Sequence, residues 1–232
     1  MTVLVLAAHP DDEVLGCGGT IARFAREGHQ VYIAILGEGI TSRYTQREEA
    51  DLAQIKALHE RSQQVAEVLG ATELFLYDLP DNRFDTVPLL DMVKIIETLV
   101  VKLQPQMVFT QHGGDLNIDH QILFRATLTA TRPMEDSPVK TLYSYEVASS
   151  SEWAFGQFDP IFHPSVFIDI SDTLDVKIRA MEMYESEARP FPHPRAPESL
   201  EAIARRWGST VVLKAAESFH LVRQVISKKV EV

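Results

Sequence analysis

An imidazole and three carboxylates lie within one short stretch near the start of the chain, Ala8-His9-Pro10-Asp11-Asp12-Glu13. Because these residues follow an apolar run, grouping so much charge there is costly unless something compensates it. A divalent cation would do so, and histidine with aspartate is an ordinary pair of zinc ligands. The alternative is a surface turn whose acids cap the next helix, since carboxylates are favourable at a helix N-terminus. The added His9 favours the metal site.

A second group of imidazoles and carboxylates lies in the middle of the chain, in Gln111-His112-Gly113-Gly114-Asp115-Leu116-Asn117-Ile118-Asp119-His120. Taken alone, His112 is typical of a solvated loop histidine, and Asp119 with His120 is typical of a helix cap. This group also follows an apolar run. Its chemistry therefore depends on whether the fold brings it to the first group.

Short apolar runs alternate along the chain with segments of helical spacing, as expected for strands buried on both faces of a sheet. We expect strands at 3–8, 30–36, 73–77, 107–110, 142–146, 166–170 and 218–225, and helices at 16–28, 47–69, 87–103, 118–131, 174–187 and 197–206. This alternation predicts an α/β fold with a doubly wound, mostly parallel sheet. The length favours a single domain over residues 1–232.

The predicted topology joins the two polar groups. In the common strand order 3-2-1-4, the first and fourth strands are neighbours, and the loops that follow them flank the same crevice. Two residues from the first loop and one from the second would make three protein ligands. Such a set leaves a position open for water, as a catalytic zinc site requires. The pattern therefore predicts a metal-dependent hydrolase.

The stretch 8–13 resembles the signature of the PIG-L/LmbE-like N-acetylglucosaminyl de-N-acetylases, and Asp119-His120 is similar to the second half of that family's His-x-Asp-His motif. The resemblance implies a Rossmann-like fold and removal of an N-acetyl group from an amino sugar or a related glycoconjugate. It implies zinc as the cofactor, although mixed nitrogen and oxygen ligands also suit Fe²⁺ or Mn²⁺. Family members often associate, so a homo-oligomer is an option.

The resemblance also implies roles for individual residues. His9, Asp12 and His120 would be the metal ligands. Asp11 would be the general base, because a metal lowers the pKa of its water towards about 7 and a carboxylate can then take the proton. The same carboxyl group would return the proton to the leaving amine.

One position departs from the family pattern. Asn117 stands where the motif has its first histidine, which in the family helps to stabilise the oxyanion and is oriented by the motif's aspartate, here Asp119. An amide can donate an N–H group, but it cannot act as a cation or an acid. His112 and His193 are the candidates to replace that histidine, and His193 lies in a proline-rich loop, 189–195, that we expect over the site.

Further polar residues follow the third predicted strand. Asn82 and Arg83 could bind sugar hydroxyls or a phosphate, and we group them with His112 as candidate substrate-binding residues. The alternative is a plain connection in which Asp85 caps the next helix. Cys17 lies among glycines in Gly16-Cys17-Gly18-Gly19, where small residues indicate close packing rather than catalysis.

The amino-acid composition limits the kinds of molecule that the protein is expected to bind. Acidic residues outnumber basic ones, 33 to 22, giving a formal net charge of −11, so we expect neither nucleic acid nor a membrane surface as a partner. The apolar N-terminal run is too short for a signal peptide or an anchor, and the lone cysteine fits a reducing compartment. We therefore expect a cytoplasmic enzyme with a small-molecule substrate. At 45% hydrophobic residues the chain should be folded, except after Lys228.

Three other functions stay open from the residues alone. The same site could cleave another small amide or a thiol conjugate. The domain could instead bind metal without catalysis, which Asn117 suggests, although a structural site would have no use for Asp11. A nucleotide-binding enzyme without metal is disfavoured, because no Gly-x-Gly-x-x-Gly fingerprint follows the first strand.

Overall fold

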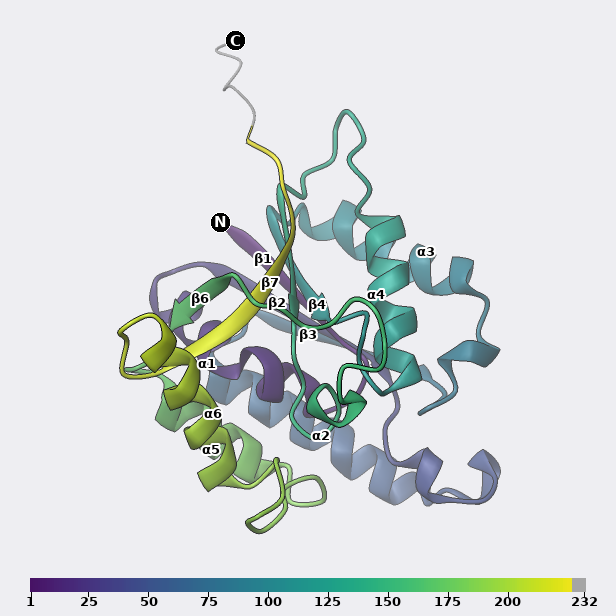
Figure 1. Ribbon diagram of the computed structural model, residues 1–232. Coiled ribbons are helices and arrows are strands. Elements are labelled where there is room, and N and C mark those ends of the chain that lie inside the picture. The colour runs from purple at the N-terminus through teal and green to yellow at the C-terminus, as the bar shows by residue number, and fades with distance from the viewer. Residues whose placement is uncertain (227–232) are drawn as a thin grey trace.

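The computed structural model describes residues 1–226, so the expectation for the chain after Lys228 lies outside the described residues. A seven-stranded sheet forms the centre of the molecule, with the strand order β3-β2-β1-β4-β5-β7-β6 (Figure 1). The strands are β1 (Thr2–Ala7), β2 (Gln30–Gly37), β3 (Glu73–Leu79), β4 (Met107–Gln111), β5 (Thr141–Tyr145), β6 (Val166–Asp169) and β7 (Ala216–Gln224). The helices are α1 (Asp12–Arg26), α2 (Leu52–Leu69), α3 (Leu89–Leu103), α4 (Ile118–Ala130), α5 (Leu174–Met183) and α6 (Pro197–Thr210).

The sheet is mostly parallel, which confirms the predicted fold class. Strands β1 to β5 pair in parallel, whereas β7 runs antiparallel to both of its neighbours, β5 and β6. The first and fourth strands are neighbours, as the common doubly wound order requires. The carboxyl ends of β1 and β4 therefore lie at the same edge of the sheet.

Helices cover both faces of the sheet. The helices α1, α2, α5 and α6 pack on one face, and α3 and α4 pack on the other (Figure 1). Alternate residues of β1 enter the two cores: Val3 and Val5 face the first, and Leu4 and Leu6 face the second. This is why β1 reads as a continuous apolar run and not as an alternation.

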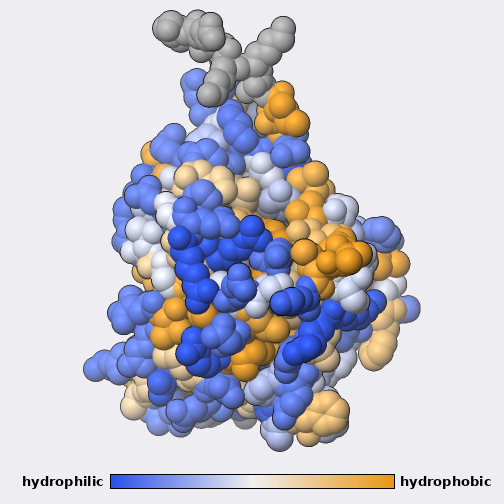
Figure 2. Space-filling view, turned by 90° about the vertical axis from the view of Figure 1, so that its left-hand side faces the viewer, coloured by the Kyte–Doolittle hydropathy of each residue, from blue (hydrophilic) through white to orange (hydrophobic). Residues whose placement is uncertain are grey.

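One face of the molecule is largely polar. Figure 2 shows the face that carries β6, α5 and α6, where hydrophilic residues cover most of the area and hydrophobic ones form separate patches. None of the helices among residues 1–226 combines the length and the apolar character that crossing a membrane would require.

Close packing sets the position of α1. A Cβ atom on Gly16 would lie 2.1 Å from the ring of Tyr145 on β5, and one on Gly19 would lie 2.8 Å from the Ile170 side chain. The Tyr145 hydroxyl in turn donates to the Leu6 carbonyl of β1. Cys17 is fully buried between these glycines, in keeping with the packing role expected for it.

Two element boundaries differ from the sequence prediction in ways that matter for the site. Helix α1 begins at Asp12 rather than at residue 16, so the acidic stretch forms its first turn. Helix α5 ends at Met183 rather than at 187. The residues between it and α6, 184–196, form a long link that we call the α5–α6 connection.

Candidate metal centre

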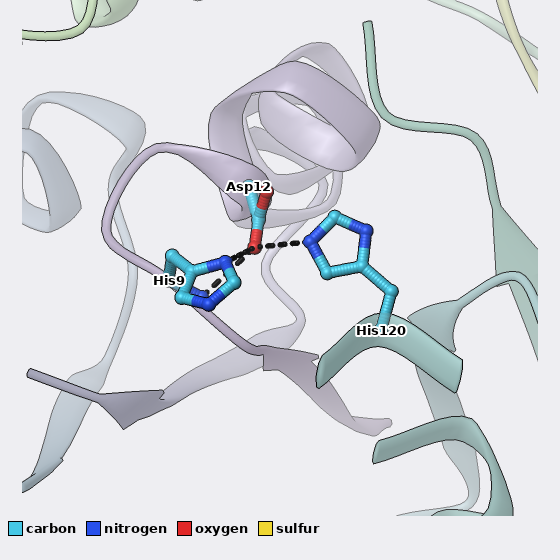
Figure 3. Close-up of side chains that lie close together, drawn as sticks. All are labelled: His9, Asp12 and His120. Atoms are coloured by element: carbon cyan, nitrogen blue, oxygen red, sulfur yellow. Dashed lines mark hydrogen bonds and ion pairs between the residues drawn. The ribbon is translucent and has the colours of Figure 1, made fainter. Parts of the chain in front are cut away.

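Two loops at the carboxyl edge of the sheet bring together side chains that are far apart in the sequence. His9 follows β1, Asp12 begins α1, and His120 lies in the first turn of α4 (Figure 3). One ligand atom from each of the three lies within 4.8 Å of the others. The Oδ2 atom of Asp12 is 3.2 Å from His9 Nδ1 and 3.2 Å from His120 Nε2. All three side chains therefore point at one position.

The donor set fits a divalent cation. Both ring nitrogens of His120 are buried and make no hydrogen bond within residues 1–226, although each lies close to a carboxylate. Unsatisfied buried polar atoms are rare in folded proteins. Two imidazoles and one carboxylate with an open fourth position are the ligands of a catalytic zinc site. His9, Asp12 and His120 could hold such an ion.

The charges around this position favour protonated histidines when no cation is bound. Burial opposes a charged imidazole, but Asp12 and Asp115 outweigh it and raise the pKa of His120 to about 9. Burial likewise opposes the charged form of Asp12, yet His120 holds the pKa of that carboxyl well below its usual range. Burial would lower the pKa of His9, but the carboxylates of Asp119 and Asp12 raise it well above the usual value.

Further residues hold the three ligands in place. Gln111, the last residue of β4, donates from Nε2 to Asp12 Oδ2 at 3.0 Å. Asp115 lies 3.1 Å from His120 Nδ1 and accepts hydrogen bonds from the hydroxyls of Ser150 and Ser151. Such partners fix the orientation and the tautomer of metal ligands. The sequence singled out the loop that contains Gln111 and Asp115, but gave neither residue a role.

The other ring nitrogen of His9 faces a second pair of carboxylates. Nε2 lies 2.9 Å from Asp119 Oδ2 and 3.3 Å from Asp81 Oδ1, and Asp119 Oδ1 accepts from the Phe84 amide. If His9 binds a cation through Nδ1, its Nε2–H donates to Asp119, which is the usual carboxylate–histidine–metal arrangement. The Asp119 carboxylate thus contacts His9, whereas the family pattern has it orient residue 117.

Asp11 lies beside the ligands and is almost fully buried, with 2% of its surface exposed. Its backbone adopts a left-handed conformation, with φ at 110°, which is strained for a residue with a side chain. Burial raises the pKa of Asp11 well above its usual value, and the Arg195 guanidinium, 2.7 Å from Asp11 Oδ2, opposes that effect. Asp11 therefore combines a strained backbone with a desolvated carboxyl group next to the candidate metal position.

A cavity of about 290 Å³ opens over these residues. Among the candidates from the sequence, its lining contains His9, Asp11, Asn82, Asn117 and His193. The rest of the wall comes mainly from the link between β2 and α2, from Ser149 and Trp153, and from the α5–α6 connection. The cavity therefore gathers side chains from loops spread over most of the chain.

The two asparagines of the cavity are linked. Asn117 is the N-cap of α4, where its Oδ1 atom accepts from the Asp119 amide at 2.9 Å. Its Nδ2 atom donates to Asn82 Oδ1 at 2.8 Å. Asn82 in turn donates to Asp81, which also lines the cavity. Sequence reasoning missed Asp81, although it directly precedes the two polar residues that were singled out.

His193 lies at the cavity wall in the α5–α6 connection. Its Nδ1 atom accepts from the Arg195 amide at 3.1 Å, and its ring meets Trp153 edge-on. Burial lowers the pKa of His193, and the charges of Arg195 and Arg189 lower it further. The neutral ring therefore carries its proton on Nε2.

The structure does not bring His112 and Arg83 to this cavity. His112 directly follows Gln111, and because successive side chains alternate in direction along a strand, its ring turns to the opposite side. There it contacts the Ser144 hydroxyl and the Pro160 carbonyl oxygen. Arg83 is exposed at the start of a short 3₁₀ turn and lies outside the residues that line the cavity.

An α/β domain that brings two histidines and an aspartate to one position, beside a buried carboxyl group that lines a cavity, has the features of a metal-dependent hydrolase. The sequence profile of one family, described as GlcNAc-PI de-N-acetylase (PIG-L), matches residues 4–131. The chain belongs to this family, which confirms the resemblance seen in the motifs.

Individual relatives agree with this assignment. The chain is 27% identical over 194 residues to the uncharacterized deacetylase YaiS of Escherichia coli (strain K12), covering 79% of this chain and 90% of that protein. It is 25% identical over 198 residues to the diacetylchitobiose deacetylase of Thermococcus kodakarensis, covering 80% of this chain and 69% of that protein.

The fold also occurs in solved structures. The crystal structure of GalB, the 4-carboxy-2-hydroxymuconate hydratase of Pseudomonas putida KT2440, superimposes with a TM-score of 0.75 at 21% identity, covering 99% of both chains. At this identity the likeness shows the fold alone.

Proposed function

We propose that this protein is a metal-dependent deacetylase that removes the N-acetyl group from an amino sugar or a related glycoconjugate. The observation that carries the proposal is the convergence of His9, Asp12 and His120 on one position beside the buried carboxyl group of Asp11. Membership of the PIG-L family supports the reaction class. Zinc is the cation that the ligand set favours, with Fe²⁺ or Mn²⁺ as alternatives.

The chain's own residues account for the proton transfers. When bound, a divalent cation supplies Lewis-acid chemistry, which polarises the amide carbonyl group and activates a water molecule. Asp11 takes a proton from the attacking water and passes it to the nitrogen atom as the C–N bond breaks. The products are acetate and the free amine. Asp115 and Asp119 keep the two imidazoles in the required orientation.

The cavity suits a small polar substrate. Its volume of about 290 Å³ lies near the lower end of the range for small-molecule sites. The amides of Asn82 and Asn117 can exchange hydrogen bonds with sugar hydroxyls. We also propose that the chain acts as one domain and that it works in the cytoplasm, as the lone buried cysteine favours.

Acetate release from a panel of N-acetyl amino sugars, measured with zinc-loaded protein, tests the proposal. The panel should contain N-acetylglucosamine, diacetylchitobiose and N-acetylglucosaminides, together with simple acetamides and a thiol conjugate. We expect equal amounts of acetate and free amine from the sugars. Turnover of the acetamides or the thiol conjugate alone would overturn the substrate class, and no turnover at all would leave a domain that only binds metal.

Two variants test the assigned roles. Replacing His9 and Asp12 together by alanine should abolish zinc binding, whereas Asp11→Asn should keep the zinc and lose turnover. Asp175→Asn is the matched control, because Asp175 is exposed on α5 and, among residues 1–226, forms an ion pair with Arg179 alone. Full activity in Asp11→Asn would exclude Asp11 as the base.

A further inference from the structure

The α5–α6 connection, residues 184–196, reaches the candidate base from the far end of the sequence. Helix α5 ends at Met183, and the chain then crosses beside the cavity before α6 begins at Pro197. Two of its side chains, Tyr184 and Arg195, connect to Asp11, one through a relay and one directly. The base therefore depends on a segment that carries none of the proposed metal ligands.

The indirect connection holds the backbone of Asp11. Tyr184 donates from its hydroxyl to Glu13 Oε1 at 2.7 Å, and Glu13 Oε2 accepts from the Asp11 amide at 3.0 Å. All three residues are almost fully buried. Because the backbone of Asp11 is in the left-handed region, it needs such contacts to stay there.

The direct connection holds the side chain of Asp11. Arg195 Nη1 donates to Asp11 Oδ2 at 2.7 Å. The guanidinium is itself fixed, because Nε donates to the Ser149 hydroxyl at 2.7 Å and Nη1 lies 3.3 Å from Glu187 Oε2. Only 23% of the Arg195 side chain is exposed. A partly buried, charge-assisted pair of this kind is stronger than a neutral hydrogen bond.

The negative charge around Asp11 explains why it needs the ion pair with Arg195. Asp11 adjoins the carboxyl groups of Asp12, Glu13 and Glu187, all of which disfavour a negative charge on it. Without a cationic partner its carboxylate would tend to turn towards water. Its other oxygen, Oδ1, accepts no hydrogen bond from residues 1–226, and Asp11 lines the cavity.

We propose that Arg195 is a positioning residue: it anchors Oδ2 of Asp11 so that Oδ1 stays directed at the water that attacks the substrate. The inference rests on the proposed function, and it assigns a role to a residue that is neither a metal ligand nor the base. Arg195 acts through Asp11 and makes no contact with the reacting atoms. Ser149 supports it in turn by fixing the guanidinium.

Kinetics of four variants test this role. With any amide that the wild type cleaves, Arg195→Met should lower kcat about a hundredfold, the size expected when a reacting group is misplaced by about 1 Å. Arg195→Lys should recover part of that loss, and Ser149→Ala should show a smaller one. KM should change by less than about threefold, because binding is not affected. Arg205→Met is the matched control, since within the described part of the chain Arg205 forms an ion pair with Glu201 alone, on the surface of α6.

Added guanidinium gives a sharper kinetic test. Millimolar guanidinium should restore part of the kcat of Arg195→Ala and leave Asp11→Asn unchanged. Wild-type kcat in Arg195→Met would overturn the proposal. So would a rise in KM at constant kcat, because Arg195 would then bind the substrate. If Arg195→Met does not fold, Arg195→Lys and Ser149→Ala carry the same comparison.

A structural readout separates this inference from the proposed function. Crystal structures of the zinc-loaded wild type and of Arg195→Met should differ in the side-chain orientation of Asp11, with the zinc content unchanged. An unchanged Asp11 would overturn the positioning role even if the wild type were an active deacetylase. If the wild type cleaved none of the amides tested, the proposed function would fail, whereas the Asp11 comparison could still be made.

Discussion

His120 lies between two carboxylates, and this makes the candidate metal site a site of competition between cation and proton. Asp12 is 3.2 Å from one ring nitrogen and Asp115 is 3.1 Å from the other. The same charges that would favour a divalent cation also favour an imidazolium ion. Metal binding must therefore release protons from histidine.

This competition predicts the pH dependence of metal affinity. The pKa of His120 is raised to about 9, so below that pH a cation must displace its proton, and the affinity should rise with pH. Each proton released corresponds to about tenfold in affinity per pH unit. Since the pKa of His9 is also raised, we expect between about tenfold and about a hundredfold per unit. Competition with a calibrated chelator from pH 6 to 8 measures the slope, and a flat profile would contradict the assignment.

Several residues of the site were predictable because they lie in compact, unusual patterns. His9, Asp12 and His120 belong to stretches where charge follows an apolar strand, and the strand order then brings them together. Arg195 gave no such signal for a role on Asp11, because the contact spans 184 residues of sequence. The direction of the His112 side chain was not predictable either: the residue directly follows Gln111 in extended backbone, where successive side chains point to opposite sides, and its ring contacts Ser144.

At the scale of elements, the position of α1 decides the geometry of the site. The helix carries Asp12 in its first turn and packs on β5 through Gly16. Most strands and helices were predicted to within a few residues from their apolar periodicity. The start of α1 was predicted four residues late, because Asp12 and Glu13 belong to a charged stretch that resembles a loop, whereas in the structure they form the first turn of the helix.

Substitution of Gly16 should test the contact between α1 and β5. A Cβ atom at Gly16 would overlap the buried Tyr145 ring, so Gly16→Ala should cost about 1–3 kcal/mol through overpacking. It should also weaken zinc binding, because α1 and Asp12 would shift. Gly18→Ala is the control in the same helix: its Cβ would lie 3.2 Å from Val14 Cγ1 and 3.3 Å from Lys177 Cγ, contacts that need a far smaller shift than the overlap at Gly16.

Urea unfolding of the metal-free variants measures the loss of stability, and chelator competition measures the weakening of zinc binding. Equal stability of the two variants would show that α1 does not depend on contact with Tyr145.

At the scale of the whole molecule, the sheet joins the N-terminal and C-terminal parts of the chain in one structure. The mostly parallel fold was predictable, since short apolar strands alternate with helices along most of the sequence. The order of the last three strands, β5-β7-β6, was not predictable, because β7 inserts between β5 and β6 in the antiparallel direction. Periodicity identifies a strand, but it does not say which neighbour the strand pairs with.

A ligand set drawn from both β1 and β4 should stabilise the whole domain when it is filled. At free zinc about a hundred times the Kd, binding adds about 2.7 kcal/mol to the free energy of unfolding. For a chain of this size that corresponds to a rise in Tm of about 5–10 °C. Thermal melts with and without zinc measure the shift, and His120→Ala should lose it. A shift that persists in His120→Ala would place the bound ion elsewhere.

The single cysteine has a practical consequence for spectroscopy. Cys17 is fully buried, and burial raises the pKa of its thiol well above the usual value, so thiol-reactive dyes and spin labels should leave the native chain untouched. A cysteine introduced at Phe191, which is exposed in the α5–α6 connection, would then carry the sole label. Fluorescence or electron paramagnetic resonance could follow that segment in solution as inhibitors enter and leave.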